Sequence, residues 1–235
     1  MKSHHRVLAA TVVLLPFVSM ASPADAQQRQ TRSLAGFDAI EVGGGIDLNL
    51  RKGDAFVVEV AASEDVAAKI VTEVVGKTLK ISRKTNFFSW GGGGTVYVTM
   101  PTLVSLDASG GSDVKTEGTF AGDSLRIGAS GGSDLTIDLA AGELNVEASG
   151  GSDVRLSGTA RSARVQSSGG SDLNASALAT DEVDVDSSGG SDLAVGVVRQ
   201  RIAGEASGGG DVTYSGTPGS VSVNTSGGAE LHHRS

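Results

Sequence analysis

The sequence predicts an all-β protein whose main body is a right-handed parallel β-helix, a solenoid with coils of 19 to 21 residues. Its first indication is a repeat: the string Ser-Gly-Gly-Ser-Asp occurs five times, and twice more as Ser-Gly-Gly-Gly-Asp and Ser-Gly-Gly-Ala-Glu. The second is that short stretches of alternating apolar and polar residues flank these strings. The third is an aromatic content of only 4%, which suits a thin aliphatic core. A regular period of this length is typical of stacked coils.

The first 26 residues have the pattern of a secretory signal peptide. A basic segment precedes an apolar stretch from Val7 to Met20, and Ala24-Asp25-Ala26 supplies the small residues of a cleavage site. The alternative is a retained membrane anchor, which needs about 18 or more apolar residues, whereas this stretch is shorter and contains Pro16. We expect a mature chain that starts at Gln27, has no integral membrane segment and is exported to the periplasm or the cell surface.

Charge and cysteine content restrict the classes of partner. The chain has a formal net charge of −8 and no cysteine. A negative chain disfavours nucleic acids and anionic membrane surfaces as partners. An exported protein without disulfide bonds depends on packing and backbone hydrogen bonds, which stacked coils supply.

Residues 34–107, which follow a predicted linker at 27–33, carry strand-like runs without the repeat. Strands are predicted at 37–42, 46–50, 55–60, 70–75, 78–82, 95–100 and 103–107. Gly76-Lys77 has the length and composition of a hairpin turn, and Pro101 marks a bend between strands. One helical turn is predicted from Ser63 to Lys69. This region is therefore the β-rich N-terminal part of the domain.

Residues 108–231 repeat the order strand, Gly-Gly turn, strand and variable turn. Within each strand the apolar residues recur with a period of two, so one face points inward. Equivalent strands of successive coils would pair in parallel about 4.8 Å apart, and the crossover rule makes the winding right-handed. Extra residues fall in the second turn, as at 175–180, so a coil could contain two sheets or three. Residues 232–235 are expected to be a tail.

Four segments together resemble a bacterial family, the head GIN domain, labelled an autotransporter adhesin and equivalent to the DUF2807 type. They are Phe37-Asp-Ala-Ile-Glu-Val-Gly-Gly-Gly-Ile-Asp-Leu, Val75-Gly-Lys-Thr-Leu-Lys-Ile, Val96-Tyr-Val-Thr-Met-Pro and the repeated Ser-Gly-Gly-Ser-Asp. The resemblance covers about residues 34–231 and implies an exported β-helical protein, with no catalytic residues to transfer. The sequence shows no translocator of many strands, so we do not expect self-export through an outer membrane.

The repeat places seven acidic residues at one position of successive coils. They are Asp113, Asp134, Asp153, Asp172, Asp192, Asp211 and Glu230. Carboxylates at strand spacing repel by about 1 kcal/mol per pair in bulk water and by roughly 3–4 kcal/mol at an effective dielectric constant of about 20. Either each carboxylate accepts hydrogen bonds from backbone N–H groups of the turns, or cations such as Ca²⁺ lie between the carboxylates. We expect turn scaffolding and no cofactor or metal, with a Ca²⁺ ladder as the alternative.

An aromatic segment in a predicted loop is the other candidate contact site. Phe87, Phe88 and Trp90 precede the glycine run 91–94. These side chains could contact a sugar or a protein ligand, or they could cover the open edge of the first coil, which β-solenoids need. We expect the covering role, with ligand contact as the alternative.

The sequence does not predict an enzyme. Histidines beyond the signal are limited to His232 and His233, where a frayed terminus is expected, so no Ser/His/Asp set can be assembled. The predicted function is a non-enzymatic, adhesin-like interaction protein of the envelope or surface, with an envelope protein or a glycan as partner. The alternatives are a periplasmic carbohydrate-binding or polysaccharide-processing protein, and an element that self-assembles head to tail through its coil edges.

Overall fold

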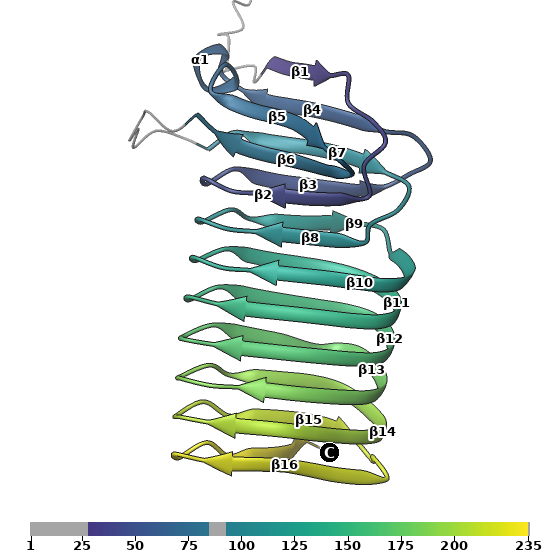
Figure 1. Ribbon diagram of the computed structural model, residues 1–235, viewed down its shortest axis with the longest axis vertical. Helices are drawn as coiled ribbons and strands as arrows, with labels where there is room; N and C mark the ends of the chain where they lie inside the picture. The colour runs from purple at the N-terminus through teal and green to yellow at the C-terminus, as the bar shows by residue number, and fades with distance from the viewer. Residues whose placement is uncertain (1–27, 85–92, 235) are drawn as a thin grey trace, which may run out of the picture.

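The computed structural model describes residues 28–84 and 93–234 as an elongated stack of β-coils (Figure 1). The predicted all-β fold is confirmed, and the helix α1 (Glu64–Ala67) lies where the sequence predicts a single helical turn. From the N-terminal end down the stack, the front strands run to the left and the back strands return to the right (Figure 1). A chain that turns clockwise as it moves away from the viewer is right-handed, so the predicted hand is confirmed.

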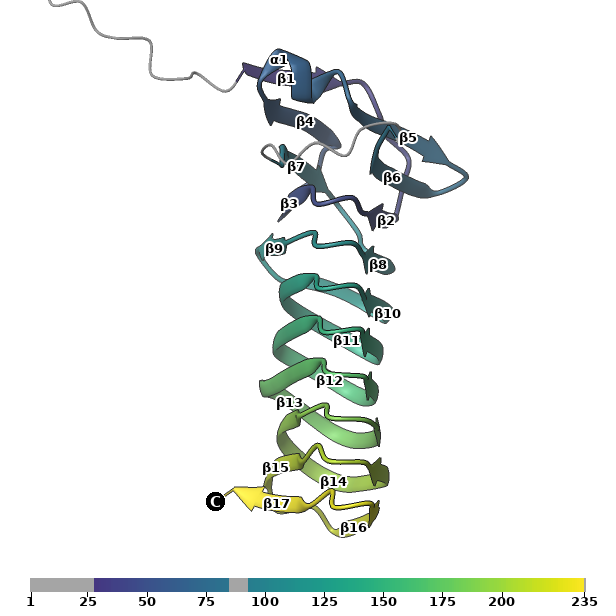
Figure 2. The same ribbon diagram turned by 90° about the vertical axis from the view of Figure 1, so that its left-hand side faces the viewer.

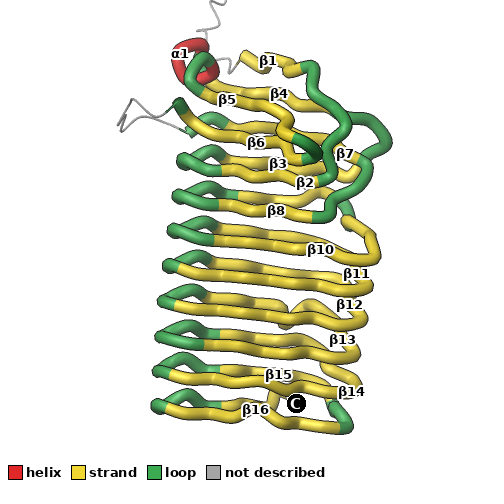
Figure 3. Tube along the Cα trace, viewed as in Figure 1, coloured by secondary structure: helices red, strands yellow, loops and turns green. Residues whose placement is uncertain are grey.

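The repeats form the regular body of the stack. Its strands are β10 (Phe120–Ala129), β11 (Asp134–Ser149), β12 (Asp153–Ser168), β13 (Asp172–Ser187), β14 (Leu193–Ser207), β15 (Val212–Gly216), β16 (Ser220–Ser226) and β17 (Leu231–Arg234). Strands β11 to β13 are each 16 residues long and pass around the second corner without a break (Figure 3). These coils therefore have two facing strand segments rather than three sheets.

Successive coils pair in parallel, and their inward side chains form one aliphatic column. Ile127 lies beside Val146, and Val146 lies beside Val165. All three are 0% exposed. The extra residue of β13 is absorbed by a register shift opposite Arg155–Ser157, on the side of the coil where the sequence predicts tolerance to insertion. The inward column is thus continuous despite changes in coil length.

The N-terminal strands join the same stack in an order that differs from their order in the chain. They are β2 (Ala39–Val42), β3 (Asp47–Lys52), β4 (Val57–Ala62), β5 (Ile70–Val75), β6 (Thr78–Arg83), β7 (Thr95–Met100), β8 (Ser105–Ala108) and β9 (Val114–Glu117). The β2–β3 coil pairs in parallel with β6–β7 on one side and with β8–β9 on the other. Chain segments far apart in sequence therefore alternate as levels of the stack.

Antiparallel strands and α1 close the N-terminal end (Figure 2). Strand β5 forms the predicted hairpin with β6, and the turn residue Gly76 has a φ of 64°. Strand β4 pairs antiparallel with β7 and with β1 (Gln28–Arg32). Residues 28–32 lie in the segment where the sequence predicts a linker. Their Gln-Arg-Gln-Thr-Arg sequence has no apolar alternation, so β1 has no strand signal of its own.

Candidate functional site

The Gly-Gly corner explains why the repeat motif is so regular. Gly131 and Gly132 have φ values of 65° and 77°, in the left-handed region that glycine adopts without strain. A Cβ on Gly131 would also lie 3.2 Å from the backbone nitrogen of Gly110 in the preceding coil. Stacked corners therefore require glycine for both conformation and space.

The second serine of the motif points into the corner. It is 0% exposed in all five complete motifs, at Ser112, Ser133, Ser152, Ser171 and Ser191. The Ser191 hydroxyl lies 2.9 Å from the Ser188 carbonyl of its own turn and 3.2 Å from the Ser167 carbonyl of the preceding coil. These buried hydroxyls satisfy turn carbonyls and link coils. Sequence reasoning gave the fastening role to the aspartates and missed this serine ladder.

The acidic residues form one row along the outside of the stack. Asp134 lies beside Asp153, and Asp153 lies beside Asp172. The pairing of Leu48 with Val114 adds Asp47 next to Asp113 as an eighth member. The sequence signal for this missed residue is Gly44-Gly45-Ile46-Asp47, where Ile46 stands in place of the inward serine. The acidic row therefore extends from β3 to the start of β17.

Backbone hydrogen bonds support the scaffolding interpretation at the C-terminal end of the acidic row. The backbone N–H of Asp211 donates to Asp192 Oδ1 at 3.1 Å, and that of Glu230 donates to Asp211 Oδ1 at 3.1 Å. Within residues 28–84 and 93–234, no group of three or more His, Cys, Asp or Glu side chains is placed to hold a metal ion.

The opposite outer face carries a groove of about 490 Å³ with charges of both signs. Lys80 Nζ lies 2.9 Å from Glu41 Oε2, and Arg126 contacts both oxygens of Glu147 at 2.8 and 2.9 Å. The hydrogen bonds that Arg126 donates to Glu147, followed by the charge of that carboxylate, raise the pKa of the Arg126 guanidinium. Gly128 leaves room for the Asp107 carboxylate in the wall of the groove, because a Cβ there would clash with Asp107 Oδ1.

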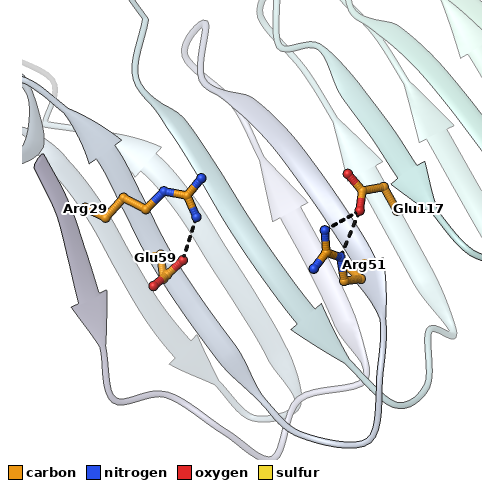
Figure 4. Close-up of polar contacts among 4 residues, drawn as sticks. All are labelled: Arg29, Arg51, Glu59 and Glu117. Atoms are coloured by element: carbon orange, nitrogen blue, oxygen red, sulfur yellow. Dashed lines mark hydrogen bonds and ion pairs between the residues drawn. The ribbon is translucent and has the colours of Figure 1, made fainter. Parts of the chain in front are cut away.

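A smaller cavity of about 120 Å³ lies on the face of the acidic row, near the N-terminal end. Figure 4 shows two of its ion pairs, Arg29 with Glu59 at 3.1 Å and Arg51 with Glu117 at 2.6 Å. The Arg29 guanidinium carbon lies 4.2 Å from the centroid of the Tyr97 ring. This cavity, which sequence reasoning missed, joins an aromatic ring to donors and acceptors from strands β1, β3, β4, β7 and β9.

The remaining candidates have different outcomes. Phe87, Phe88 and Trp90 lie outside the described residues, so their role remains a prediction. Residues 232–234, expected to be part of a tail, belong to β17, which pairs in parallel with β15. His233 stacks on Tyr214 with ring centroids 4.8 Å apart, which helps to order this strand. None of the helices in the described part of the chain is long and apolar enough to span a membrane.

Several solved structures have a fold similar to that of this protein. Similar solved structures include a putative adhesin from Bacteroides fragilis (TM-score 0.84, 24% identity, covering 88% of this chain and 96% of that one). A putative lipid binding protein from Parabacteroides distasonis has a TM-score of 0.66 at 18% identity, covering 87% of this chain and 96% of that one. A putative adhesin from Parabacteroides merdae has a TM-score of 0.63 at 16% identity, covering 88% and 96%. At these identities the likeness shows the fold alone.

The comparison with curated proteins gives no match. The family model described as "Putative auto-transporter adhesin, head GIN domain" matches residues 36–218, which is most of the chain and includes the N-terminal coils as well as the repeats. The protein therefore belongs to the head GIN domain family.

Proposed function

We propose that the protein is an exported, non-enzymatic, adhesin-like interaction module of the cell envelope or cell surface. Its family and most of the similar structures carry adhesin names, and the sequence begins with a predicted signal peptide. The observation that carries the proposal is the exposed acidic row, which runs from β3 to β17 on one outer face. A row spread over many coils suits multivalent contact with an extended partner better than it suits the enclosed chemistry of a catalytic pair.

The proposed partner is an envelope protein or a glycan that contacts the face bearing the acidic row. Exposed carboxylates on this face accept hydrogen bonds and attract positive charge. Because contact would be distributed over several coils, each carboxylate would contribute little and the sum would set the affinity.

Neutralising matched pairs of acids on the two faces tests the proposal. Asp134→Asn with Asp172→Asn removes two charges from the acidic row, and Asp186→Asn with Glu205→Gln removes two from the opposite face. Capture of the mature protein by its native envelope fraction is measured for both. We expect binding to fall several-fold in the first variant only. Equal binding by both variants, or no capture of the wild-type protein, would contradict the proposal.

The cavity at Tyr97 favours a second candidate, a carbohydrate-binding protein. Asn49, Tyr97 and the ion pair Arg51–Glu117 offer an aromatic ring together with amide, guanidinium and carboxylate groups, which suit sugar hydroxyls. A glycan array with wild type and Tyr97→Ala tests this candidate, since binding at this cavity would be lost in the variant. Release of unsaturated or shortened products from a bound glycan would instead indicate polysaccharide processing.

A further inference from the structure

The C-terminal end of the stack has an open edge. Within the described residues, β16 pairs with β14 and β17 pairs with β15, and neither has a strand on its other side. Val221 occupies the inward position of Ile202 in the coil above. Ile202 is 0% exposed, whereas Val221 is 44% exposed. The last coil therefore presents backbone N–H and C=O groups and part of the apolar column to solvent.

The β16 strand of this edge lacks the features that keep edge strands from pairing. Natural edge strands carry charges, prolines, bulges or covering segments. The seven residues of β16, Ser-Val-Ser-Val-Asn-Thr-Ser, include no charged residue and no proline. At the opposite end of the stack, the outer strand β1 carries Arg29 and Arg32. The two ends of the molecule thus differ in their capacity to add a strand.

We propose that two copies of the chain associate tail to tail through this edge. A two-fold axis normal to the sheets would pair β16 with β16 and β17 with β17 of the partner, both antiparallel. The turn Gly227-Gly228 joins β16 to β17. Val223 lies four residues before this turn and His232 lies four residues after it. The two residues are therefore at about the same distance along their strands, and one axis can pass through both. Both strands of the last coil then pair in a common register.

The register that this axis imposes is complementary in charge and in shape. On the outer face of β17, Glu230 lies opposite Arg234 of the partner subunit and Arg234 lies opposite Glu230 of the partner subunit. Directly opposed residues of antiparallel strands place their Cβ atoms about 4.5–5.5 Å apart, within reach of an ion pair. On β16, Val223 faces its own copy and Val221 faces Thr225 of the partner subunit, so the apolar column continues across the interface.

The capped N-terminal end limits this assembly to two copies. Each copy uses its C-terminal edge, and its other end is covered by α1 and the antiparallel strands β1, β4 and β5. The contact is isologous and closed, unlike a head-to-tail contact, which would extend into a filament. The association places the two N-terminal ends, with their Tyr97 cavities, at opposite tips of one rod.

The oligomeric state of the mature chain tests the proposal. Mass is measured by light scattering over about a hundredfold range of chain concentration, because mass action shifts a dimer across such a range. Val223→Lys places two ammonium groups against each other on the axis, and we expect the monomer mass. Ser222→Lys adds the same charge to the same strand on the outer face, and we expect the dimer mass to remain. Circular dichroism and melting verify that both variants fold.

Exchanging the charges of Glu230 and Arg234 is a second, independent test of where the interface lies. Arg234→Glu opposes two carboxylates in each pair, and we expect the dimer dissociation constant to rise on the order of tenfold. Adding Glu230→Arg to this variant restores opposite charges and should restore the affinity. A wild-type protein that stays monomeric throughout the range, a Val223→Lys variant that still dimerises, or a double variant without rescue would each overturn the proposal.

Discussion

The two corners of each coil follow different rules. At the Gly-Gly corner the backbone turns through left-handed glycines and a buried serine hydroxyl satisfies the carbonyls, as at Gly131 and Ser133. At the second corner β11 to β13 bend as continuous strands, and the extra residue of β13 lies before this corner, in the segment that follows the Gly-Gly turn. The first corner is specified by stereochemistry and space, whereas the second is specified by pairing with its neighbours. Substitutions should therefore affect the two corners very differently.

Adding one methyl group at each corner should give the largest contrast. In Gly131→Ala, the left-handed conformation and the contact with Gly110 should together cost about 2–3 kcal/mol of unfolding free energy. In Gly122→Ala, at the second corner, the nearest atom to the new Cβ is the Ser124 oxygen at 3.8 Å. We expect this control to change stability by less than about 1 kcal/mol. Urea unfolding measures both, and equal losses would remove the distinction between the corners.

Removing a hydroxyl should have an intermediate effect. Ser152 is 0% exposed, and its Oγ lies 2.9 Å from the Ser149 carbonyl and 3.2 Å from the Ala129 carbonyl. Ser152→Ala should cost about 1–2 kcal/mol, because it removes the hydrogen bonds that this buried hydroxyl donates to the two carbonyls. Ser162→Ala, at the second corner of the same coil, should stay within about 0.5 kcal/mol of wild type. Thermal and urea unfolding that ranked the two variants in the reverse order would contradict a structural role for the serine ladder.

Neutralising one carboxylate at the Gly-Gly corner should have a smaller effect. Asp134→Asn relieves like-charge repulsion from Asp113 and Asp153, so we expect a gain of at most about 0.5 kcal/mol at low salt. The gain should shrink as salt is added, because exposed charges are screened. Asp192→Asn is the comparison, because Asp192 Oδ1 accepts the Asp211 N–H and weakening that bond should offset the gain.

Calcium should have the smallest effect. If the carboxylates act as turn scaffolding, excess Ca²⁺ should leave the melting temperature of the protein nearly unchanged, because no site binds the folded state selectively. Differential scanning calorimetry with Ca²⁺, and then with a chelator, measures this. A rise of several degrees that the chelator reverses would show that cations occupy the acidic row.

The sequence predicts the features that depend on a regular local period. It does not predict pairing between strands that lie far apart in the chain. The spacing of the glycine pairs predicts the coils, and Gly76-Lys77 predicts the β5–β6 hairpin. Pairing of β2 with β8, by contrast, joins segments about 66 residues apart, and the Gly44-Gly45 pair that follows β2 lies outside the regular spacing of the repeat. Asp47 is missed because Ile46 stands where the repeat has its serine. The backbone N–H of Ile46 nevertheless donates a hydrogen bond to Ser112 Oγ at 3.2 Å. The Tyr97 cavity is missed because five strands from this rearranged end build it.

The order of levels at the N-terminal end also bears on how the chain acquires its structure. A coil of the repeat can dock on the coil made just before it, but β2–β3 has both neighbours later in the chain. The bond from Ile46 to Ser112 spans 66 residues, and closing such a loop costs about 1 kcal/mol more than closing one repeat. High sequence separation slows folding. We therefore expect β2–β3 to take its place in the stack only after β9 is available, so the coil that comes first in the chain is not the first to form.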